Sequence, residues 1–206
     1  MKVFIIHGSF GNPEGNWFPW LKKELEIVGH EVYVPQFPIE DYEEFARQVE
    51  NNPKITPENQ TVDNWMQAFE PYMEKIDIET VFVAHSLGPA FVLKILEKIQ
   101  KKVRACVFVS GFIGELPGNP VYNAANSTFF KTPINWNKIK SLSDSYYLLA
   151  SDNDPYVPSQ FLRGFAEKLG VKLKIVSGGK HLNAEAGYVK FPRILDIIKS
   201  TKYLKA

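Results

Sequence analysis

The sequence predicts an α/β protein with a compact, six-stranded, mainly parallel sheet and helices on both faces. Apolar segments of strand length alternate with segments whose apolar residues recur at helical spacing. Most of the connecting stretches are short, which favours a parallel sheet over separate layers of strands and helices. Polar and glycine-rich residues follow the apolar segments directly, where the carboxyl ends of parallel strands would lie.

The first half of the chain predicts two strands and three helices. Residues 2–6 are almost entirely apolar, and the strand they form ends at a loop rich in Gly, Asn and Pro. Apolar residues recur at helical spacing over 17–28 and stop at Gly29, which suits a helix end. A second strand is expected at 31–35. Two further helices are expected near 41–49 and from a cap at Thr61 or Asp63 towards 76.

The second half predicts four strands around one long irregular segment. The apolar strand 80–84 runs without a spacer into a helix at about 89–100, and 103–109 is another apolar strand. Residues 111–143 are rich in Gly, Pro, Asn and aromatic residues, which is typical of a short lid or binding segment. The remaining elements are strands at 145–150 and 171–176 and helices at 159–169 and 191–204.

Length and composition indicate one domain. The 206 residues can form one sizeable core but would crowd two, and no repeat or linker divides them, so we expect a single α/β domain over 1–206. A formal net charge of +1 produces no field that would attract nucleic acid or an anionic membrane. We therefore expect neither as a partner, and leave a protein partner open.

Three further features bear on location and cysteine chemistry. No apolar stretch reaches the length of a membrane span, and no signal peptide is visible before the first strand. A cytoplasmic location is therefore expected. Cys106 is the single cysteine and lies in an apolar run, so the chain has no intrachain disulfide and a buried thiol is expected there.

The turn after the third predicted strand contains Ala84-x-Ser86-x-Gly88. This differs by one residue from the G-x-S-x-G nucleophile elbow, which exposes a serine hydroxyl at the edge of a parallel sheet. Small residues flank such a serine because the strained turn brings strand and helix backbones close together. Ala84 adds one methyl group to that space. By itself the motif fits an ordinary strand-to-helix turn equally well, since short patterns recur by chance.

Acidic and imidazole side chains follow the fifth and sixth predicted strands. A serine hydroxyl attacks at neutral pH only when an imidazole takes its proton and a carboxylate orients that imidazole. The order Ser86, Asp154, His181 is that of α/β-hydrolases, and we predict these residues as nucleophile, acid and base. Asp152 is the alternative acid. We prefer Asp154 because Pro155 makes the following turn rigid, although such a run is also an ordinary turn sequence.

Other interpretations of these residues are weaker. His85 adjoins Ser86, but neighbouring residues at a strand end point to opposite faces, so it would be a poor base. Asp152-x-Asp154 lacks the Gly and Glu of a calcium loop. The glycines of the first loop do not have the spacing of a nucleotide-binding fingerprint, and no P-loop lysine is present.

The oxyanion formed by serine attack needs backbone N–H donors. The amide of Leu87 follows the nucleophile directly, and Ser9, with Phe10 as the alternative, follows Gly8 in the first loop. A merely flexible glycine turn is an equal interpretation of that loop. Substrate contacts are expected from Phe10, Trp17, Phe129 and Trp136. Ordinary core packing is the equal alternative for these aromatic residues.

With these residues in view, the sequence resembles the small α/β-hydrolase family of retinoblastoma-binding serine hydrolases and YdeN-type bacterial proteins. The similarity spans nearly the whole chain, and the family pattern implies the same nucleophile, acid and base. The segments that carry it are His7-Gly8 with 17–22, 84–88, 136–140, 154–158 and 178–181.

The chain departs from that family pattern at two positions. Ala84 stands where the family commonly has Gly, and Lys180 interrupts the usual Gly-His pair before the base. The L-x-C-x-E motif of the mammalian relatives is absent, because Arg104 and Phe108 flank Cys106. Their partner binding is therefore not transferred to this chain.

These observations lead us to expect a serine hydrolase that acts as a carboxylesterase on small acyl esters through an acyl-enzyme intermediate. A small-molecule acyl substrate is the expected partner, and no metal or cofactor is required for this chemistry. Two alternatives remain: a hydrolase-like binding protein without turnover, and a hydrolase of the amidase or peptidase type.

Overall fold

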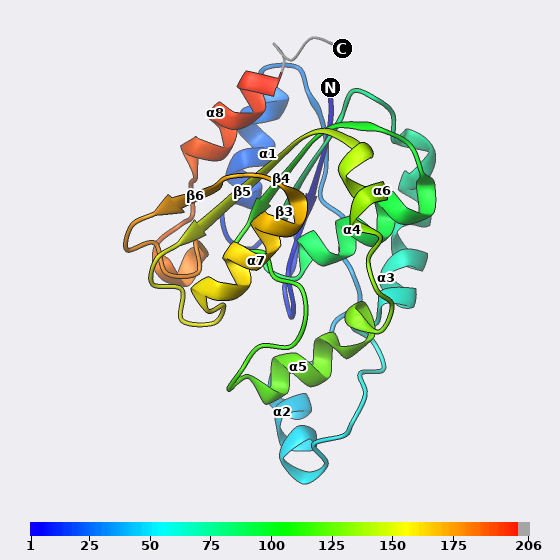
Figure 1. Cartoon of the computed structure of the whole chain (residues 1–206), viewed down its shortest axis with the longest axis vertical. Helices are drawn as coiled ribbons and strands as arrows, with labels where there is room; N and C mark the ends of the chain where they lie inside the picture. The colour runs from blue at the N-terminus through cyan, green and yellow to red at the C-terminus, as the bar shows by residue number, and fades with distance from the viewer. Residues whose placement is uncertain (202–206) are drawn as a thin grey trace.

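Six parallel strands form a single sheet in the order β2-β1-β3-β4-β5-β6. The structure is a computed structural model that describes residues 1–201 (Figure 1). The predicted fold class is confirmed. The strands are β1 (Lys2–Ile6), β2 (Glu31–Tyr33), β3 (Thr80–His85), β4 (Val103–Val109), β5 (Ser143–Ser151) and β6 (Leu173–Val176).

Helices cover both faces of this sheet, and each face has its own apolar cluster. The α-helices are α1 (Phe18–Ile27), α2 (Tyr42–Asn51), α3 (Val62–Phe69), α4 (Gly88–Ile99), α5 (Pro120–Asn126), α6 (Trp136–Ser141), α7 (Ser159–Leu169) and α8 (Pro192–Thr201). Helices α1 and α8 pack on one face, whereas α3, α4, α6 and α7 pack on the other. None of the helices in residues 1–201 is both long and apolar enough to cross a membrane.

The observed elements differ from the predicted ones mainly at their ends. The helix expected towards 76 stops at Phe69 and continues as the 3-10 helix η1 (Glu70–Lys75), because Pro71 has no N–H to donate to the preceding turn. Thr61 is the cap of α3, since its Oγ1 accepts from Asn64 N at 3.1 Å. The last helix was expected to reach residue 204 and the domain residue 206. Residues 202–206 lie outside the described part of the chain.

The irregular segment 111–143 contains α5, α6 and the 3-10 helix η2 (Ser127–Phe130). Helix α5 packs on α2, and the two helices lie together beyond the carboxyl ends of the central strands (Figure 1). Phe45 and Val49 of α2 and Ala125 of α5 form their small apolar contact, against which Phe10 also packs. The loop after β1 is thereby joined to both helices above the carboxyl edge.

The turn between β3 and α4 depends on Gly88. A methyl group on this residue would lie 2.8 Å from the carbonyl oxygen of Ile6 and 2.9 Å from that of His7. The same methyl would be 3.3 Å from the Cβ of Ala84, which is fully buried. The methyl group of Ala84 therefore fits because the residue opposite it has no side chain, which accounts for the departure from Gly at this position.

We predict that Gly88→Ala destabilises the fold while Gly164→Ala does not. The added methyl at Gly88 meets backbone atoms that cannot move aside, which should lower the free energy of unfolding by about 1–3 kcal/mol. Gly164 lies in α7 with nothing within 4 Å of its added methyl, so alanine should stabilise the helix by about 0.4–1 kcal/mol. Urea unfolding of both variants measures the difference. An unchanged midpoint for Gly88→Ala would contradict the close approach.

Candidate active site

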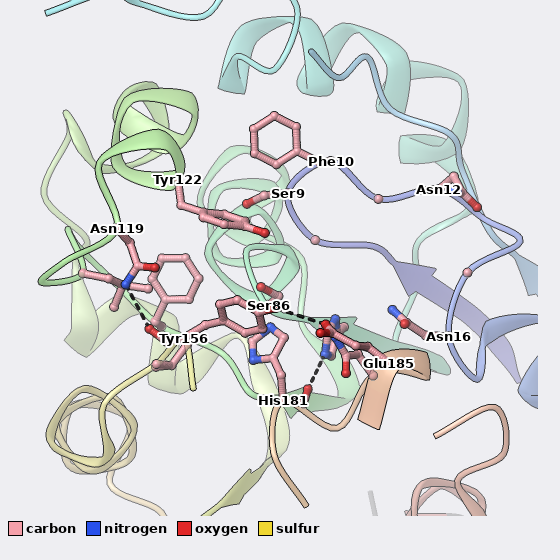
Figure 2. A pocket seen from close by; sticks show the side chains of 18 residues that line it. Ser9, Phe10, Asn12, Asn16, Ser86, Asn119, Tyr122, Tyr156, His181 and Glu185 are labelled. Atoms are coloured by element: carbon pink, nitrogen blue, oxygen red, sulfur yellow. Dashed lines mark hydrogen bonds between the residues drawn. The ribbon is translucent and has the colours of Figure 1, made fainter. Parts of the chain in front are cut away.

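A cleft of about 280 Å³ opens at the carboxyl edge of the sheet. Loops that follow β1, β3, β4, β5 and β6 line it, so segments far apart in the sequence meet there (Figure 2). Ser86, His181 and Phe10 are among the lining residues that the sequence singled out. The cleft lies where an open parallel sheet commonly binds its ligands.

Ser86 is held in a strained backbone conformation at the base of the cleft. Its φ is 59°, in the left-handed region, which costs a non-glycine residue of order 1–3 kcal/mol. Its amide donates to the carbonyl oxygen of Val109 at 2.9 Å, which fixes the turn to the end of β4. Within 81–90, Ser86 is the one residue that is not buried. The turn therefore exposes a single hydroxyl group to the cleft.

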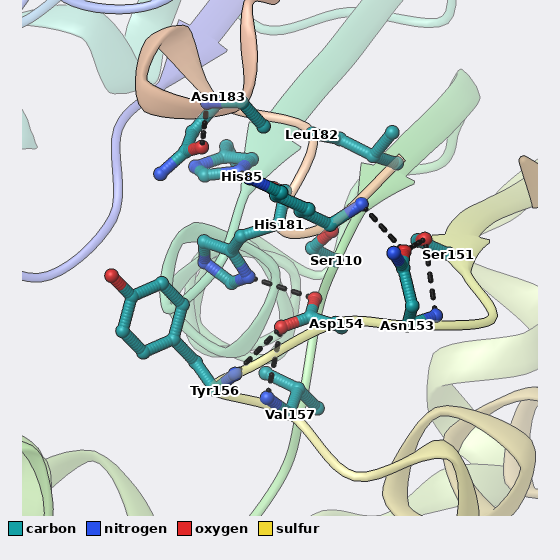
Figure 3. A network of polar contacts seen from close by, with 12 residues as sticks. His85, Ser110, Ser151, Asn153, Asp154, Tyr156, Val157, His181, Leu182 and Asn183 are labelled. Carbon is teal, nitrogen blue, oxygen red and sulfur yellow. Dashed lines mark hydrogen bonds and ion pairs between the residues drawn. The ribbon is translucent and has the colours of Figure 1, made fainter. Parts of the chain in front are cut away.

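His181 is hydrogen-bonded to the carboxylate of Asp154, with Nδ1 and Oδ2 2.8 Å apart (Figure 3). The other oxygen of Asp154 accepts from the amides of Tyr156 at 2.9 Å and Val157 at 3.0 Å. Burial disfavours the charged carboxylate, but the hydrogen bonds from His181 and these amides outweigh it and lower the pKa of Asp154. The carboxylate therefore stays ionised and accepts the Nδ1 proton, which leaves Nε2 of a neutral His181 ring as the acceptor.

Asp152 has a different set of contacts. Its carboxylate accepts from Ser177 Oγ and from the amide of Gly178, both at 2.8 Å, and so joins the loops that follow β5 and β6. Between these two aspartates lies Asn153, whose Oδ1 accepts from the amide of Lys180 at 2.8 Å. Lys180 has a φ of 49°, a conformation that glycine adopts more easily. The second departure from the family pattern is thus held in place by Asn153.

Two other histidines near the cleft are buried and brace the loops. His85 donates from Nε2 to the carbonyl oxygen of His181 at 2.9 Å (Figure 3), and burial lowers its pKa to about 3. His7 donates from Nδ1 to the carbonyl oxygen of Gly8 at 2.8 Å and accepts from Phe37 N at 3.1 Å; burial lowers its pKa to about 4. Both rings are therefore neutral around neutral pH, and their nitrogens contact backbone groups.

The loop after β1 lies directly against Ser86. A methyl group on Gly8 would be 2.7 Å from the Cβ of Ser86 and 3.2 Å from its Oγ. The amide of Phe10 donates to Gln60 Oε1 at 2.8 Å. The backbone amides of Ser9 and Leu87 have no hydrogen-bond acceptor within residues 1–201. Of the two loop amides that the sequence left open, that of Ser9 is the one without a protein acceptor.

Of the four aromatic residues expected to contact substrate, the structure places only Phe10 in the cleft wall. Trp17 is fully buried and donates from Nε1 to the carbonyl oxygen of Leu182 at 3.0 Å. Phe129 is buried in the core beside α3 and α4, and Trp136 packs against α7 on the same face of the sheet. These three residues therefore lie outside the wall of this cleft, since aromatic composition does not distinguish core from cleft.

Most of the polar wall of the cleft was not predicted. Tyr156 packs edge-on against the ring of His181, with centroids 5.0 Å apart, and its hydroxyl donates to Glu185 Oε2 at 3.0 Å. These residues lie in the loops after β5 and β6. They could have been found from the rule that open parallel sheets bind ligands at the carboxyl ends of their strands. The other polar side chains of the wall are Ser9, Asn12, Asn16, Asn119 and Tyr122, which Figure 2 labels, and Asn183. Of these, only Ser9 was singled out in the sequence, for its backbone amide. Among residues 1–201, no three His, Cys, Asp or Glu residues group so that they could hold a metal ion.

The chain is similar over nearly its whole length to a known family model and to two known proteins. The family model described as serine hydrolase matches residues 3–200. The putative hydrolase YdeN of Bacillus subtilis is 27% identical over 201 residues, which cover 97% of this chain and 95% of YdeN. The serine hydrolase RBBP9 of Rattus norvegicus is 26% identical over 205 residues, 97% of this chain and 94% of RBBP9.

Solved structures show the same fold. The crystal structure of the B. subtilis ydeN gene product superposes with a TM-score of 0.80 at 27% identity and 97% coverage of both chains. The methylesterase MES16 of Arabidopsis superposes with a TM-score of 0.67 over 99% of this chain and 100% of MES16, at 12% identity. At that identity the likeness concerns the fold alone.

We predict that the buried ring of His85 makes the protein less stable in acid. Its folded pKa of about 3 lies below the ordinary 6.5, so the unfolded chain takes up a proton first as the pH falls below 6.5. Between pH 6.5 and about pH 4 this should remove roughly 3 kcal/mol of the free energy of unfolding. His85→Gln retains an N–H donor towards His181 and should lose less stability over that range. The measurement is urea unfolding of both proteins at a series of pH values. If the free energy of unfolding fell equally with pH in both, the ring would not be buried in its neutral form.

Proposed function

The chain belongs to the serine hydrolase family, and we propose that it is a carboxylesterase for small acyl esters that acts through Ser86, His181 and Asp154. The observation behind this proposal is that a strained, accessible serine and an imidazole bonded to a buried carboxylate line one cleft. A volume of about 280 Å³ is slightly below the common range of roughly 300–1,000 Å³ for ligand pockets, which favours a small ester.

In the proposed reaction, Ser86 Oγ attacks the acyl carbonyl carbon while Nε2 of His181 accepts the hydroxyl proton. The electron pair of the carbonyl bond moves to its oxygen, and the carboxylate of Asp154 stabilises the imidazolium. The tetrahedral intermediate collapses to the acyl enzyme, and the departing alkoxide takes the proton from His181. A water molecule then repeats the attack with His181 as base, which releases the acid and restores Ser86.

The proposed oxyanion donors are the amides of Ser9 and Leu87. Leu87 directly precedes α4, whose N-terminal dipole favours negative charge at this point. Ser9 follows Gly8, which lies against the Ser86 side chain, so its amide is close to the reacting oxygen. Each donor of this kind contributes about 3–4 kcal/mol to transition-state stabilisation in well-studied hydrolases.

The first test is labelling by a fluorophosphonate, which reacts with an activated serine. We expect the folded wild type to be labelled and to hydrolyse short p-nitrophenyl esters. Ser86→Ala should lose the label and about 10⁴-fold or more in kcat, because the nucleophilic oxygen is gone. Circular dichroism of the variant provides the folding control. Absence of both labelling and ester hydrolysis in the wild type would refute the enzyme proposal in favour of a binding protein.

The second test separates the two aspartates. Asp154→Asn can no longer accept the Nδ1 proton of His181, so the ring is held in the wrong tautomer and kcat should fall about 10⁴-fold. Asp152→Asn is the matched control, because Asp152 is exposed and contacts only the supporting loop, so the loss should stay below about tenfold. Equal falls in kcat for the two variants would contradict a special role for Asp154. Acyl amides assayed in parallel report whether ester or amide cleavage is preferred.

A further inference from the structure

Two buried amide side chains lie behind the loop that follows β1. Gln60 is 0% exposed and directly precedes the capping residue of α3; Asn126 is 1% exposed and is the last residue of α5. Neither lines the cleft, and neither attracted attention in the sequence. Burying two amides is costly unless their groups are hydrogen-bonded, so their partners indicate what they do.

Two hydrogen bonds join these side chains to residues 8–10, here called the oxyanion loop, and a third joins the two side chains to each other. Gln60 Oε1 accepts from the amide of Phe10 at 2.8 Å, and Gln60 Nε2 donates to Asn126 Oδ1 at 2.9 Å. The hydroxyl of Ser9 donates to the same Asn126 oxygen at 2.8 Å. We propose that Gln60 and Asn126 are positioning residues that hold the oxyanion loop in the geometry needed for catalysis. This inference rests on the proposed function of Ser86.

The hydrogen bonds determine the orientation of the Ser9 amide. The carbonyl oxygen of Gly8 accepts from His7 Nδ1 at 2.8 Å and from Gly11 N at 3.2 Å. Because the peptide bond is planar and trans, the N–H of Ser9 points the opposite way from that carbonyl oxygen. Gln60 and Asn126 bind the following amide and the Ser9 hydroxyl. The peptide groups on both sides of Ser9 are therefore held, while the Ser9 amide itself has no acceptor within residues 1–201.

The conformation of the loop needs such support. Phe10 has a φ of 52°, an unfavourable value for a residue with a side chain, which costs of order 1–3 kcal/mol. Its hydrogen bond to Gln60 opposes relaxation of that strain. Catalytic geometry tolerates little movement, because an oxyanion donor must lie about 2.7–3.1 Å from the reacting oxygen. A small shift of the loop would therefore weaken stabilisation of the transition state more than substrate binding.

A second observation also indicates a role beyond stability. The Nδ2 group of Asn126 is buried and has no hydrogen-bond partner within residues 1–201. An unsatisfied buried donor costs about 1–3 kcal/mol, and an isosteric apolar residue would avoid that cost. Asn126 carries this unsatisfied donor, whereas its side-chain oxygen accepts two hydrogen bonds, one of them from Ser9. Its position at the end of α5 also means that segment 111–143 is hydrogen-bonded to the oxyanion loop through this side chain.

The test uses Gln60→Met and Asn126→Leu, which keep side-chain volume and remove the hydrogen bonds. We expect kcat for a short p-nitrophenyl ester to fall 10- to 100-fold with KM changed less than threefold. Binding of a trifluoromethyl ketone, which forms an oxyanion on Ser86, should weaken by the same factor as kcat/KM. Ser9→Ala removes one hydrogen bond at a half-buried surface and should lower kcat three- to tenfold; it provides a readout even where a buried substitution prevents folding.

Thr128→Val is the matched control. Thr128 Oγ1 accepts from Val62 N at 3.0 Å, so it also joins η2 to α3, but it does not contact the oxyanion loop. We expect this variant to keep kcat within twofold of the wild type. If the wild type is active and the Gln60, Asn126 and Ser9 variants match Thr128→Val in kcat and ketone affinity, this inference is overturned. The proposed function would stand in that case. A wild type that neither binds fluorophosphonate nor cleaves esters would instead overturn the proposed function.

Discussion

The close approach of three backbone segments at the turn around Ser86 is the constraint on which the site depends. The end of β1, the start of α4 and the loop after β1 meet so closely that a single methyl on Gly88 or Gly8 would overlap their atoms. At this crowded turn Ser86 has a left-handed backbone conformation, and Gly8, the residue before Ser9, lies against the Ser86 side chain. Strain in the turn and access to the hydroxyl are thus two results of one packing arrangement.

Burial and hydrogen-bond partners give three histidines of the carboxyl edge different roles. His7 and His85 are enclosed by apolar rings, and burial lowers the pKa of each, so they remain neutral and donate to carbonyl groups. His181 instead bonds to Asp154, whose pKa is lowered despite its burial by the donors around it. Uncharged rings therefore support the loops at this edge, and the hydrogen-bonded imidazole and carboxylate of His181 and Asp154 lie at the cleft.

Most of the fold could be predicted because it follows from local patterns. Apolar segments marked all six strands, and Gly29 marked a helix end. The alternation of strands and helices determined the parallel sheet, and the sheet determined that the loops holding Ser86, Asp154 and His181 would share one edge. Errors came where a local break was overlooked, as at Pro71, or where composition alone was used, as for Trp17 and Phe129.

The sequence by itself determined the fold class, the order of the proposed nucleophile, acid and base, and the turn that exposes Ser86. Only the tertiary structure decided which aspartate bonds to His181, because Asp152 and Asp154 lie two residues apart in one turn and differ in direction. It also decided which loop amide is left without an acceptor, since that depends on Gln60, some 50 residues away, and on Asn126 beyond it. Local sequence specifies backbone conformation, whereas hydrogen-bond partners distant along the chain become neighbours only when the sheet and its loops assemble.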